Sequence, residues 1–297
     1  MSGTCFRSGF VAVVGRPNVG KSTLVNRLTG RKVSIVSDKP QTTRNRVAGV
    51  VSRPTSQVVL LDIPGFQKPR DELTRRMQAT VDQTLQEVDG ALWLIAGDES
   101  VGKGDAFIAS RLAASGVPTV IAVNKTDLLS EERAQRQAAI AATMGVSGPV
   151  LLISAVSGRG LEEVIPLLEG FLAEGPPYFP DGTLTDRPDE WLVGELIREK
   201  VLHVTEEEVP HSVSVEVLEM EARENDDLID VRAAIYVERA SQRPIVLGRG
   251  GLRIKQIGTE ARRDIEILLG SRVFLDLGVQ VRRHWRRNPG LLERLGL

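Results

Sequence analysis

Apolar and polar residues alternate in blocks through the first half of the chain. Short apolar runs rich in β-branched residues recur there, and each is followed by an amphipathic stretch of helical length. The apolar runs are Phe10–Val14, Val58–Leu61, Ala91–Ile95, Thr119–Val123 and Val150–Ile153. The amphipathic stretches are Lys21–Thr29, Asp71–Glu87, Ala106–Ser115, Glu131–Met144 and Leu161–Leu172. This alternation predicts an α/β fold with a doubly wound, mostly parallel sheet, whose ligands bind beyond the carboxyl ends of the strands.

A proline- and glycine-rich segment, Gly175–Gly182, interrupts the alternation and cannot continue a helix. Beyond it the pattern predicts a helix, two strands, two helical segments and a last strand. These elements are expected at about Pro188–Leu202, Ser212–Met220, Ile229–Glu238, Gly248–Ile257, Thr259–Leu269 and Arg272–Val281. We therefore expect a first domain over residues 1–174, a linker over 175–187 and a smaller α+β domain over 188–297.

Composition narrows the setting of the protein. A chain of 297 residues suits one large and one small domain, each with its own core. Its single cysteine, Cys5, cannot form an internal disulfide, so we expect a reducing, cytoplasmic location. No apolar run approaches the roughly 18 residues of a membrane span. Peripheral contact with the inner face of the cell membrane stays open, and nothing in the sequence predicts an obligate oligomer.

The formal net charge of −1 hides a strong asymmetry between two neighbouring segments. Residues 182–238 hold 16 acidic and 5 basic side chains, whereas residues 239–297 hold 13 basic and 5 acidic ones. A basic block of this density is a candidate surface for binding phosphate groups. A solvated helix face is the alternative explanation.

The first candidate site is a loop between the first predicted strand and the first predicted helix. It fits the G-x-x-x-x-G-K-[ST] pattern of phosphate-binding loops, and Thr23 continues it into the helix. Its residues are Gly15, Arg16, Pro17, Asn18, Val19, Gly20, Lys21 and Ser22. Backbone N–H groups and the positive end of the helix dipole bind phosphates in such loops. We expect Lys21 to reach the β- and γ-phosphates and the Ser22 hydroxyl to hold Mg²⁺.

A second motif follows the strand predicted at Thr119–Val123 and indicates which base is bound. Asn124, Lys125 and Asp127 form an N-K-x-D arrangement. The Asp127 carboxylate can accept bonds from N1–H and the exocyclic amine of guanine, a pair of donors that adenine lacks. The Lys125 stem can lie along the purine face, and Asn124 can join this loop to the phosphate loop. Ser154 and Ala155 follow the next strand, where the Ala155 N–H is a candidate donor to guanine O6.

A third motif, Asp62, Ile63, Pro64 and Gly65, follows the strand predicted at Val58–Leu61. We expect Asp62 to hold Mg²⁺ through water and the Gly65 N–H to sense the γ-phosphate. Of Thr42 and Thr43, we favour Thr43 as the residue that completes the Mg²⁺ shell when GTP is bound. Loss of the γ-phosphate would then release the threonine segment, which is a physical switch. Two threonines in a surface turn are the alternative.

With these motifs in this order, the first half of the chain resembles a translation-factor-type P-loop GTPase. The segment Pro40–Arg44, the residue Phe66 and the C-terminal module extend the resemblance over nearly the whole chain, to the Era family of bacterial ribosome-assembly GTPases. The resemblance implies a Mg²⁺-dependent GTPase domain, a type II KH domain and small-subunit ribosomal RNA as a partner. It also implies a role in assembly of the 30S subunit.

Two residues bear on the rate of hydrolysis. Phe66 stands where many GTPases place a glutamine that orients the attacking water, so slow intrinsic hydrolysis is expected. In GTPases that resemble this one, an asparagine at the position of Asn18 helps to hold a monovalent cation, which implies a role for K⁺. A simple turn-shaping role is the alternative for Asn18. We therefore expect Lys21, Thr43, Gly65 and Asn18 to serve the reaction.

The C-terminal domain carries a G-x-x-G loop made of Gly248, Arg249, Gly250 and Gly251. The bare pattern carries little weight, but its place between two predicted helices resembles the KH loop that clamps about four nucleotides of single-stranded RNA. Arg249, Arg253 and Lys255 supply positive charge. The chain departs from the family pattern at Gly250, where a lysine is usual.

Further along, Trp285 lies in a basic tail and is either a base-stacking residue or part of the core. The function expected is a GTP-controlled RNA-binding switch. An RNA-binding scaffold with a vestigial G domain is the alternative.

Overall fold

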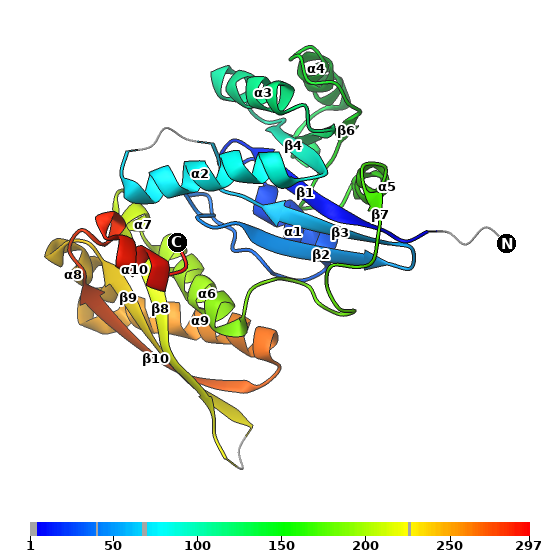
Figure 1. Cartoon of the computed structure of the whole chain (residues 1–297). Helices are drawn as coiled ribbons and strands as arrows, with labels where there is room; N and C mark the ends of the chain where they lie inside the picture. The colour runs from blue at the N-terminus through cyan, green and yellow to red at the C-terminus, as the bar shows by residue number, and fades with distance from the viewer. Residues whose placement is uncertain (1–4, 40, 67–69, 225–226) are drawn as a thin grey trace. The chain divides into compact units, whose positions relative to one another are not determined.

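The computed structural model describes residues 5–39, 41–66, 70–224 and 227–297 of the chain, so Pro40 lies outside the described residues. The chain divides into two compact units (Figure 1). The N-terminal unit comprises Met1–Ser34, Thr43–Pro69 and Arg76–Asp186, and the C-terminal unit comprises Ile35–Thr42, Arg70–Arg75 and Arg187–Leu297. No described helix is both long enough and apolar enough to cross a membrane.

The N-terminal unit is built on one sheet whose strands run in the order β2-β3-β1-β4-β5-β6, with β7 beside β1. The strands are β1 (Arg7–Gly15), β2 (Val47–Arg53), β3 (Ser56–Asp62), β4 (Gly90–Ala96), β5 (Thr119–Asn124), β6 (Val150–Leu152) and β7 (Ala173–Glu174). Only β2 and β7 pair antiparallel to their neighbours among these strands. The helices are α1 (Lys21–Thr29), α2 (Glu72–Glu87), α3 (Lys103–Ser115), α4 (Glu131–Ala142) and α5 (Val164–Glu169). The predicted doubly wound, mostly parallel sheet is confirmed.

The strand β2 escaped the sequence prediction, because Ala48 and Gly49 interrupt its β-branched run. The glycine has a packing role. A Cβ at Gly49 would lie 2.6 Å from Val25 Cγ1 of α1, so a side chain there would push the helix away from the sheet. Gly49, which makes β2 difficult to recognise in the sequence, is therefore also the residue that allows α1 to pack on that strand.

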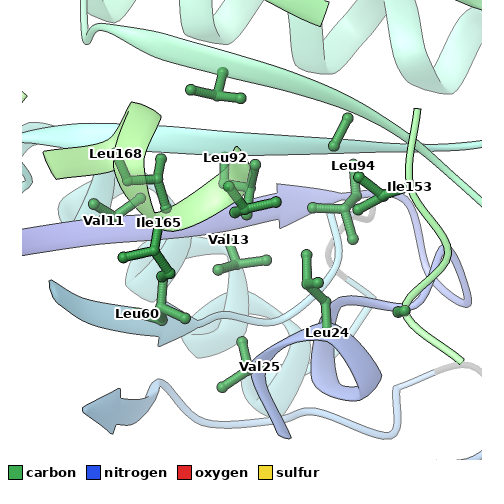
Figure 2. Packing of buried hydrophobic residues seen from close by; sticks show 14 of the residues in the cluster. Val11, Val13, Leu24, Val25, Leu60, Leu92, Leu94, Ile153, Ile165 and Leu168 are labelled. Carbon is green, nitrogen blue, oxygen red and sulfur yellow. The ribbon is translucent and has the colours of Figure 1, made fainter. Parts of the chain in front are cut away.

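Alternate residues of the central strands enter cores on opposite faces of the sheet. On one face, Val11 of β1 and Leu92 of β4 pack with Leu24 of α1 and Leu168 of α5, as Figure 2 shows. On the other face, residues from the same two strands pack with side chains of α2, α3 and α4. The strands are buried on both faces, which explains why they read as continuous apolar runs.

The proline- and glycine-rich segment is bound to the N-terminal unit by hydrogen bonds between its backbone and a side chain of β3. Phe179 N donates to Gln57 Oε1 at 2.9 Å, and Gln57 Nε2 donates back to Phe179 O at 3.0 Å. Further along, Val50 N donates to Leu184 O at 2.9 Å. The chain from Phe179 to Leu184 is therefore held against β2 and β3.

The C-terminal unit packs two long helices, α6 and α9, on a sheet with strand order β10-β9-β8. Its elements are α6 (Asp189–Val204), α7 (Val209–Ser212), β8 (Ser214–Ala222), β9 (Leu228–Val237), α8 (Arg243–Leu247), α9 (Leu252–Leu269), β10 (Arg272–Val281) and α10 (Pro289–Arg294). The strand β9 is parallel to β10 and antiparallel to β8. The order of a helix, two strands, two helices and a strand is observed, apart from the short α7 and α10, but its two helices are α8 and α9, whereas both expected ranges, Gly248–Ile257 and Thr259–Leu269, lie in or beside α9.

Two expected boundaries in this unit are corrected. Ser212 ends α7 instead of starting a strand, and its hydroxyl donates to Glu208 O at 3.1 Å. The helix α9 is continuous through Gly258, where the sequence suggested a break. The apolar residues Ile257, Ala261 and Ile265 keep one buried face across the glycine, so packing outweighs the low helix propensity of Gly258.

Two short pieces from the first quarter of the chain belong to the C-terminal unit. In the first piece, Val36 N donates to Glu199 Oε1 at 2.9 Å, and the Arg198 guanidinium donates to Thr42 O. In the second, Asp71 forms an ion pair with Arg286 at 2.7 Å. One of the points at which the chain passes from one unit to the other is therefore the Thr42–Thr43 peptide bond, inside the segment expected to act as the switch.

Candidate functional site

The phosphate-loop motif lies between the end of β1 and the start of α1, as predicted. Gly20, the residue before α1, has a φ of 99°, and a Cβ there would overlap Asn124 Nδ2. Glycine is therefore required on both conformational and packing grounds. Val19 is buried and anchors the loop, whereas Pro17 and Asn18 are exposed. Asn18 takes the left-handed conformation with a φ of 63°.

Lys21 brings a buried positive charge to this loop, because the residue is only 7% exposed. Its Nζ donates to Arg16 O at 3.1 Å and lies 3.4 Å from Gly15 O. Burial lowers the pKa of Lys21, and the nearby Asp62 carboxylate partly opposes that shift. An anion bound in the loop would compensate a buried ammonium that is otherwise poorly solvated.

Oxygen atoms from three separate segments meet beside Lys21. Ser22 Oγ donates to Asp62 Oδ2 at 2.7 Å and lies 3.0 Å from Thr43 Oγ1. Asp62 is fully buried, and its Oδ1 has no hydrogen-bond partner within the described parts of the chain. Burial raises the pKa of Asp62, while Lys21 and Ser22 act against that rise. A hard dication suits such a set of oxygens and would compensate the buried carboxylate, so this cluster fits Mg²⁺.

Thr42 and Thr43 have different surroundings, which bears on the choice between them. The Thr42 hydroxyl donates to Lys39 O at 2.6 Å, within its own turn. Thr43 faces Ser22, as the distance above shows. The geometry therefore favours Thr43 as the residue of the oxygen cluster.

The base-recognition motif is joined to both neighbouring loops through Asn124, at the end of β5. Asn124 Nδ2 donates to Val19 O at 2.8 Å, and its Oδ1 accepts from Ala155 N at 2.9 Å. The first bond is the predicted link to the phosphate loop. The second gives the Ala155 N–H a partner other than the expected guanine O6, so in this structure Ala155 shapes the loop through Asn124.

The last residue of the N-K-x-D motif, Asp127, has an exposed carboxylate. Thr126 Oγ1 donates to Ile153 O at 2.8 Å and fixes a short turn, Thr126–Leu128. Asp127 lies in that turn and is exposed, whereas Ser154 is fully buried. Lys125 has a left-handed φ of 65°, and its Nζ donates to Asp98 Oδ2 at 3.1 Å. Asp127 is thus exposed, and its role in reading a base stays a prediction.

The third motif leaves β3 with Ile63 and Pro64 buried, and Gly65 and Phe66 partly exposed. A Cβ at Gly65 would lie 3.1 Å from Pro17 N, so the glycine permits close approach to the phosphate loop. The Phe66 ring packs edge-on against Phe107 of α3, with centroids 5.9 Å apart at 79°. The aromatic side chain is therefore engaged in an apolar contact and offers no group to orient water.

The G-x-x-G loop of the C-terminal unit joins α8 to α9. Gly248 has a φ of 73°, and a Cβ there would lie 2.7 Å from Arg253 Cβ, so glycine is required. Arg249 and Gly250 are exposed at the apex. The Arg253 guanidinium donates to Ile245 O, which ties the two helices together. Arg253 was expected as a cation for RNA, but here it also holds the loop in shape.

A cavity of about 430 Å³ lies beside the G-x-x-G loop's helix, between one face of α9 and β10. Its lining combines the cations Lys255 and Arg262 with Leu275 and Leu277 of β10. Cations and apolar side chains together suit a strand of nucleotides, with its phosphates and flat bases. The sequence predicted only Lys255 of these residues. The helical spacing of Lys255, Thr259 and Arg262 is the signal that was available, but it is visible only once α9 is recognised as continuous.

Trp285 is fully buried, and its Nε1 donates to Ser212 O at 2.8 Å. It belongs to the core of the C-terminal unit, so the base-stacking alternative is wrong for this structure. An indole N–H placed in a core finds a backbone acceptor in this way.

Comparisons with known proteins agree with the two units. A family model described as a 50S ribosome-binding GTPase matches residues 10–125, and a KH domain model matches residues 208–286. A crystal structure of a variant of Aquifex aeolicus Era bound to GDP and aluminium fluoride is 35% identical, with a TM-score of 0.94 over 98% of this chain and 99% of that chain. A structure of Era in complex with MgGDPNP and nucleotides 1506–1542 of 16S ribosomal RNA matches with the same identity, coverage and TM-score.

Proposed function

The chain belongs to the Era family of GTPases, and from this premise we propose that it is a slowly hydrolysing GTP switch that binds single-stranded small-subunit ribosomal RNA and assists 30S assembly. We propose that the protein carries out this function in the cytoplasm. The observation that carries the proposal is the meeting of Ser22, Thr43 and Asp62 beside the buried Lys21, in a chain that also has a KH unit.

Each residue of the nucleotide site has a proposed task. Lys21 binds the β- and γ-phosphates, and Ser22, Thr43 and Asp62 hold Mg²⁺, directly or through water. Mg²⁺ supplies charge neutralisation of the phosphates when it is bound. The Gly65 N–H contacts the γ-phosphate, and Asp127 reads the guanine edge. Thr43 and Gly65 depend on the γ-phosphate, so its loss releases both segments.

We propose that hydrolysis is slow because Phe66 stands where many GTPases have a glutamine that orients the attacking water. The Phe66 ring packs against Phe107 and cannot take over that task. Another residue could compensate for the missing glutamine. Asn18 is exposed in the phosphate loop and has a left-handed backbone conformation. We propose that Asn18 helps to hold K⁺ beside the phosphates, where the cation offsets charge that develops during hydrolysis.

Single-turnover hydrolysis measured in K⁺ and in Na⁺ buffers tests this cation site. We expect cleavage about tenfold faster in K⁺, and we expect Asn18→Ala to remove the difference while leaving the Na⁺ rate unchanged. Equal rates in the two buffers contradict the cation site. Absence of cleavage in both buffers would instead favour the alternative function, an RNA-binding scaffold with a vestigial G domain.

For RNA, we propose that a single strand passes over Gly248–Gly251 and continues into the cavity between α9 and β10. The Era structure with nucleotides 1506–1542 of 16S ribosomal RNA supports this assignment by family membership. Arg249, Lys255 and Arg262 lie along the proposed path and supply the charge that phosphates need.

The apex of the loop offers a matched pair of variants. Gly250 has a φ of 59° and no atom within 4 Å of an added Cβ, so asparagine and aspartate both fit there. Gly250→Asp should weaken binding of a single-stranded 16S fragment about tenfold relative to Gly250→Asn, because only the aspartate repels phosphate. Fluorescence anisotropy with labelled RNA measures the difference. Equal affinity of the two variants would remove this loop from the RNA path, and GTP binding should match wild type in both.

A further inference from the structure

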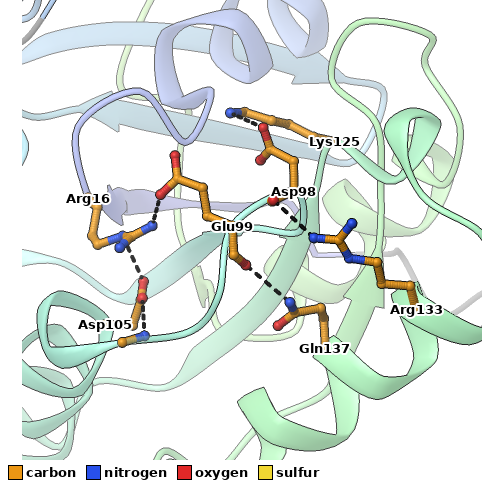
Figure 3. Close-up of polar contacts among 8 residues, drawn as sticks. Arg16, Asp98, Glu99, Asp105, Lys125, Arg133 and Gln137 are labelled. Atoms are coloured by element: carbon orange, nitrogen blue, oxygen red, sulfur yellow. Dashed lines mark hydrogen bonds and ion pairs between the residues drawn. The ribbon is translucent and has the colours of Figure 1, made fainter.

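A turn that follows β4, formed by Asp98 and Glu99, contacts both nucleotide loops of the N-terminal unit (Figure 3). Asp98 Oδ2 accepts a hydrogen bond from Lys125 Nζ of the base-recognition motif at 3.1 Å. The Glu99 carboxylate pairs with the guanidinium of Arg16 in the phosphate loop. Two consecutive acidic residues therefore connect the loop that reads the base with the loop that binds the phosphates.

The backbone of this turn is itself held in place by α4. The Arg133 guanidinium donates to Asp98 O at 3.2 Å, and Gln137 Nε2 donates to Glu99 O at 3.1 Å (Figure 3). Both carbonyls are fixed from the same helix, so the two carboxylates project from a restrained backbone. Because this backbone is already restrained, the two carboxylates can hold the side chains that they contact in fixed positions with little further loss of conformational entropy.

Lys125 is restrained at both ends of its side chain. Its left-handed φ of 65° is unusual for a residue with a Cβ, so the surrounding loop must impose it. At the other end, Asp98 holds the ammonium, while Asp98 Oδ1 is buried with no hydrogen-bond partner in the described residues. The stem between these two ends is the part proposed to lie along the purine face.

Arg16 is restrained from two directions. Besides its pair with Glu99, its Nε lies 3.3 Å from Oδ1 of the fully buried Asp105. The other oxygen of Asp105 accepts from Gly102 N at 3.0 Å at the start of α3. A Cβ at Gly104 would lie 2.7 Å from Arg16 Cδ, so α3 also packs closely on the arginine stem. Arg16 therefore anchors the phosphate loop to the turn and to α3.

We propose that Asp98 and Glu99 are positioning residues that act through Lys125 and Arg16 and set the rate at which guanine nucleotide dissociates. Their side-chain contacts are with Lys125 and Arg16, and they make none of the contacts that join Ser22, Thr43 and Asp62. GDP and GTP are thus held equally by this turn, and hydrolysis of bound GTP does not depend on it. The inference rests on the nucleotide loops assigned in the proposed function.

The test measures dissociation of fluorescent GDP, and of a fluorescent non-hydrolysable GTP analogue, by stopped flow with the full chain. Asp98→Asn and Glu99→Gln should each raise both dissociation rates about tenfold, because each removes one charge-assisted contact. The single-turnover rate constant for hydrolysis of bound GTP and the melting temperature without nucleotide should stay at wild-type values. Glu132→Gln, the same chemical change at an exposed carboxylate on α4, should dissociate like wild type.

Double variants decide whether the effect passes through the proposed partners. Asp98→Asn should cause no further increase in a protein that carries Lys125→Ala, and Glu99→Gln should cause none in a protein that carries Arg16→Ala. The same factor in both backgrounds, or unchanged rates in the single variants, would overturn the inference. Wild-type protein that fails to bind fluorescent GDP would overturn the proposed function and the inference together, whereas wild-type binding with unchanged variants overturns the inference alone.

Discussion

Lys21→Ala is expected to weaken binding of GDP and GTP about 1,000-fold, or about 4 kcal/mol. The Lys21 ammonium is buried and its pKa is lowered by burial, so phosphate is its natural source of compensation. Without nucleotide the alanine variant should melt no lower than wild type, since it lacks a poorly solvated charge. The rise in melting temperature on adding MgGDP should be lost.

Isothermal titration calorimetry and thermal unfolding check this prediction together. Lys103→Ala is the matched control, because Lys103 is an exposed lysine at the first position of another helix of the same unit. It should bind nucleotide like wild type. Near-normal GDP affinity in Lys21→Ala would contradict the assignment of Lys21 to the phosphates.

Asp127→Asn is expected to weaken GTP binding about 100-fold and to favour the xanthine nucleotide instead. The Asp127 carboxylate offers acceptors only, which suits the two neighbouring donors of guanine. An amide at this exposed position offers one donor and one acceptor, which suits the carbonyl and N1–H of xanthine. The turn itself should survive, because it is held by Thr126 and not by Asp127.

Competition of GTP and XTP against fluorescent GDP measures the change in preference. Asp181→Asn, an exposed aspartate elsewhere in the N-terminal unit, is the control and should keep the guanine preference. If Asp127→Asn still prefers GTP over XTP by the wild-type factor, another group reads the base.

The sequence was informative about the nucleotide loops because each of them is a continuous segment beside a strand. Glycines at Gly15 and Gly20, the pair of Lys21 and Ser22, and the triplet around Asn124 carry their chemistry locally. A parallel sheet then brings its strand ends to one edge, so segments far apart in the chain meet there. The bond between Asn124 and Val19 is an outcome of that rule.

Contacts between ordinary polar residues could not be predicted in the same way. Nothing in the sequence marks Asp98 as the partner of Lys125 or Glu99 as the partner of Arg16, since acidic residues after a strand are common. The partner of the Ala155 N–H depended on the side-chain orientation of Asn124. The sequence left Trp285 as either a base-stacking residue or a core residue, because its neighbours are basic, and the packing of the C-terminal unit places it in the core.

The C-terminal unit includes residues from the first half of the chain, and this limits how the two halves of the gene can be exchanged between related proteins. Arg198 and Glu199 are 1% and 2% exposed, and the backbone groups that they bind, Thr42 O and Val36 N, come from a distant part of the gene. A fragment that begins at Pro188 would keep the ion pairs of Arg198 with Glu195 and of Glu199 with Lys200 but would lose these two hydrogen bonds, at a cost of about 1.5–3 kcal/mol for each bond to a charged group. The C-terminal unit is therefore not encoded by one continuous stretch of the gene: it also includes Ile35–Thr42 and Arg70–Arg75, which lie within the GTPase half. Gene fusions that exchange the halves at the proline-rich segment would have to include both of these short stretches.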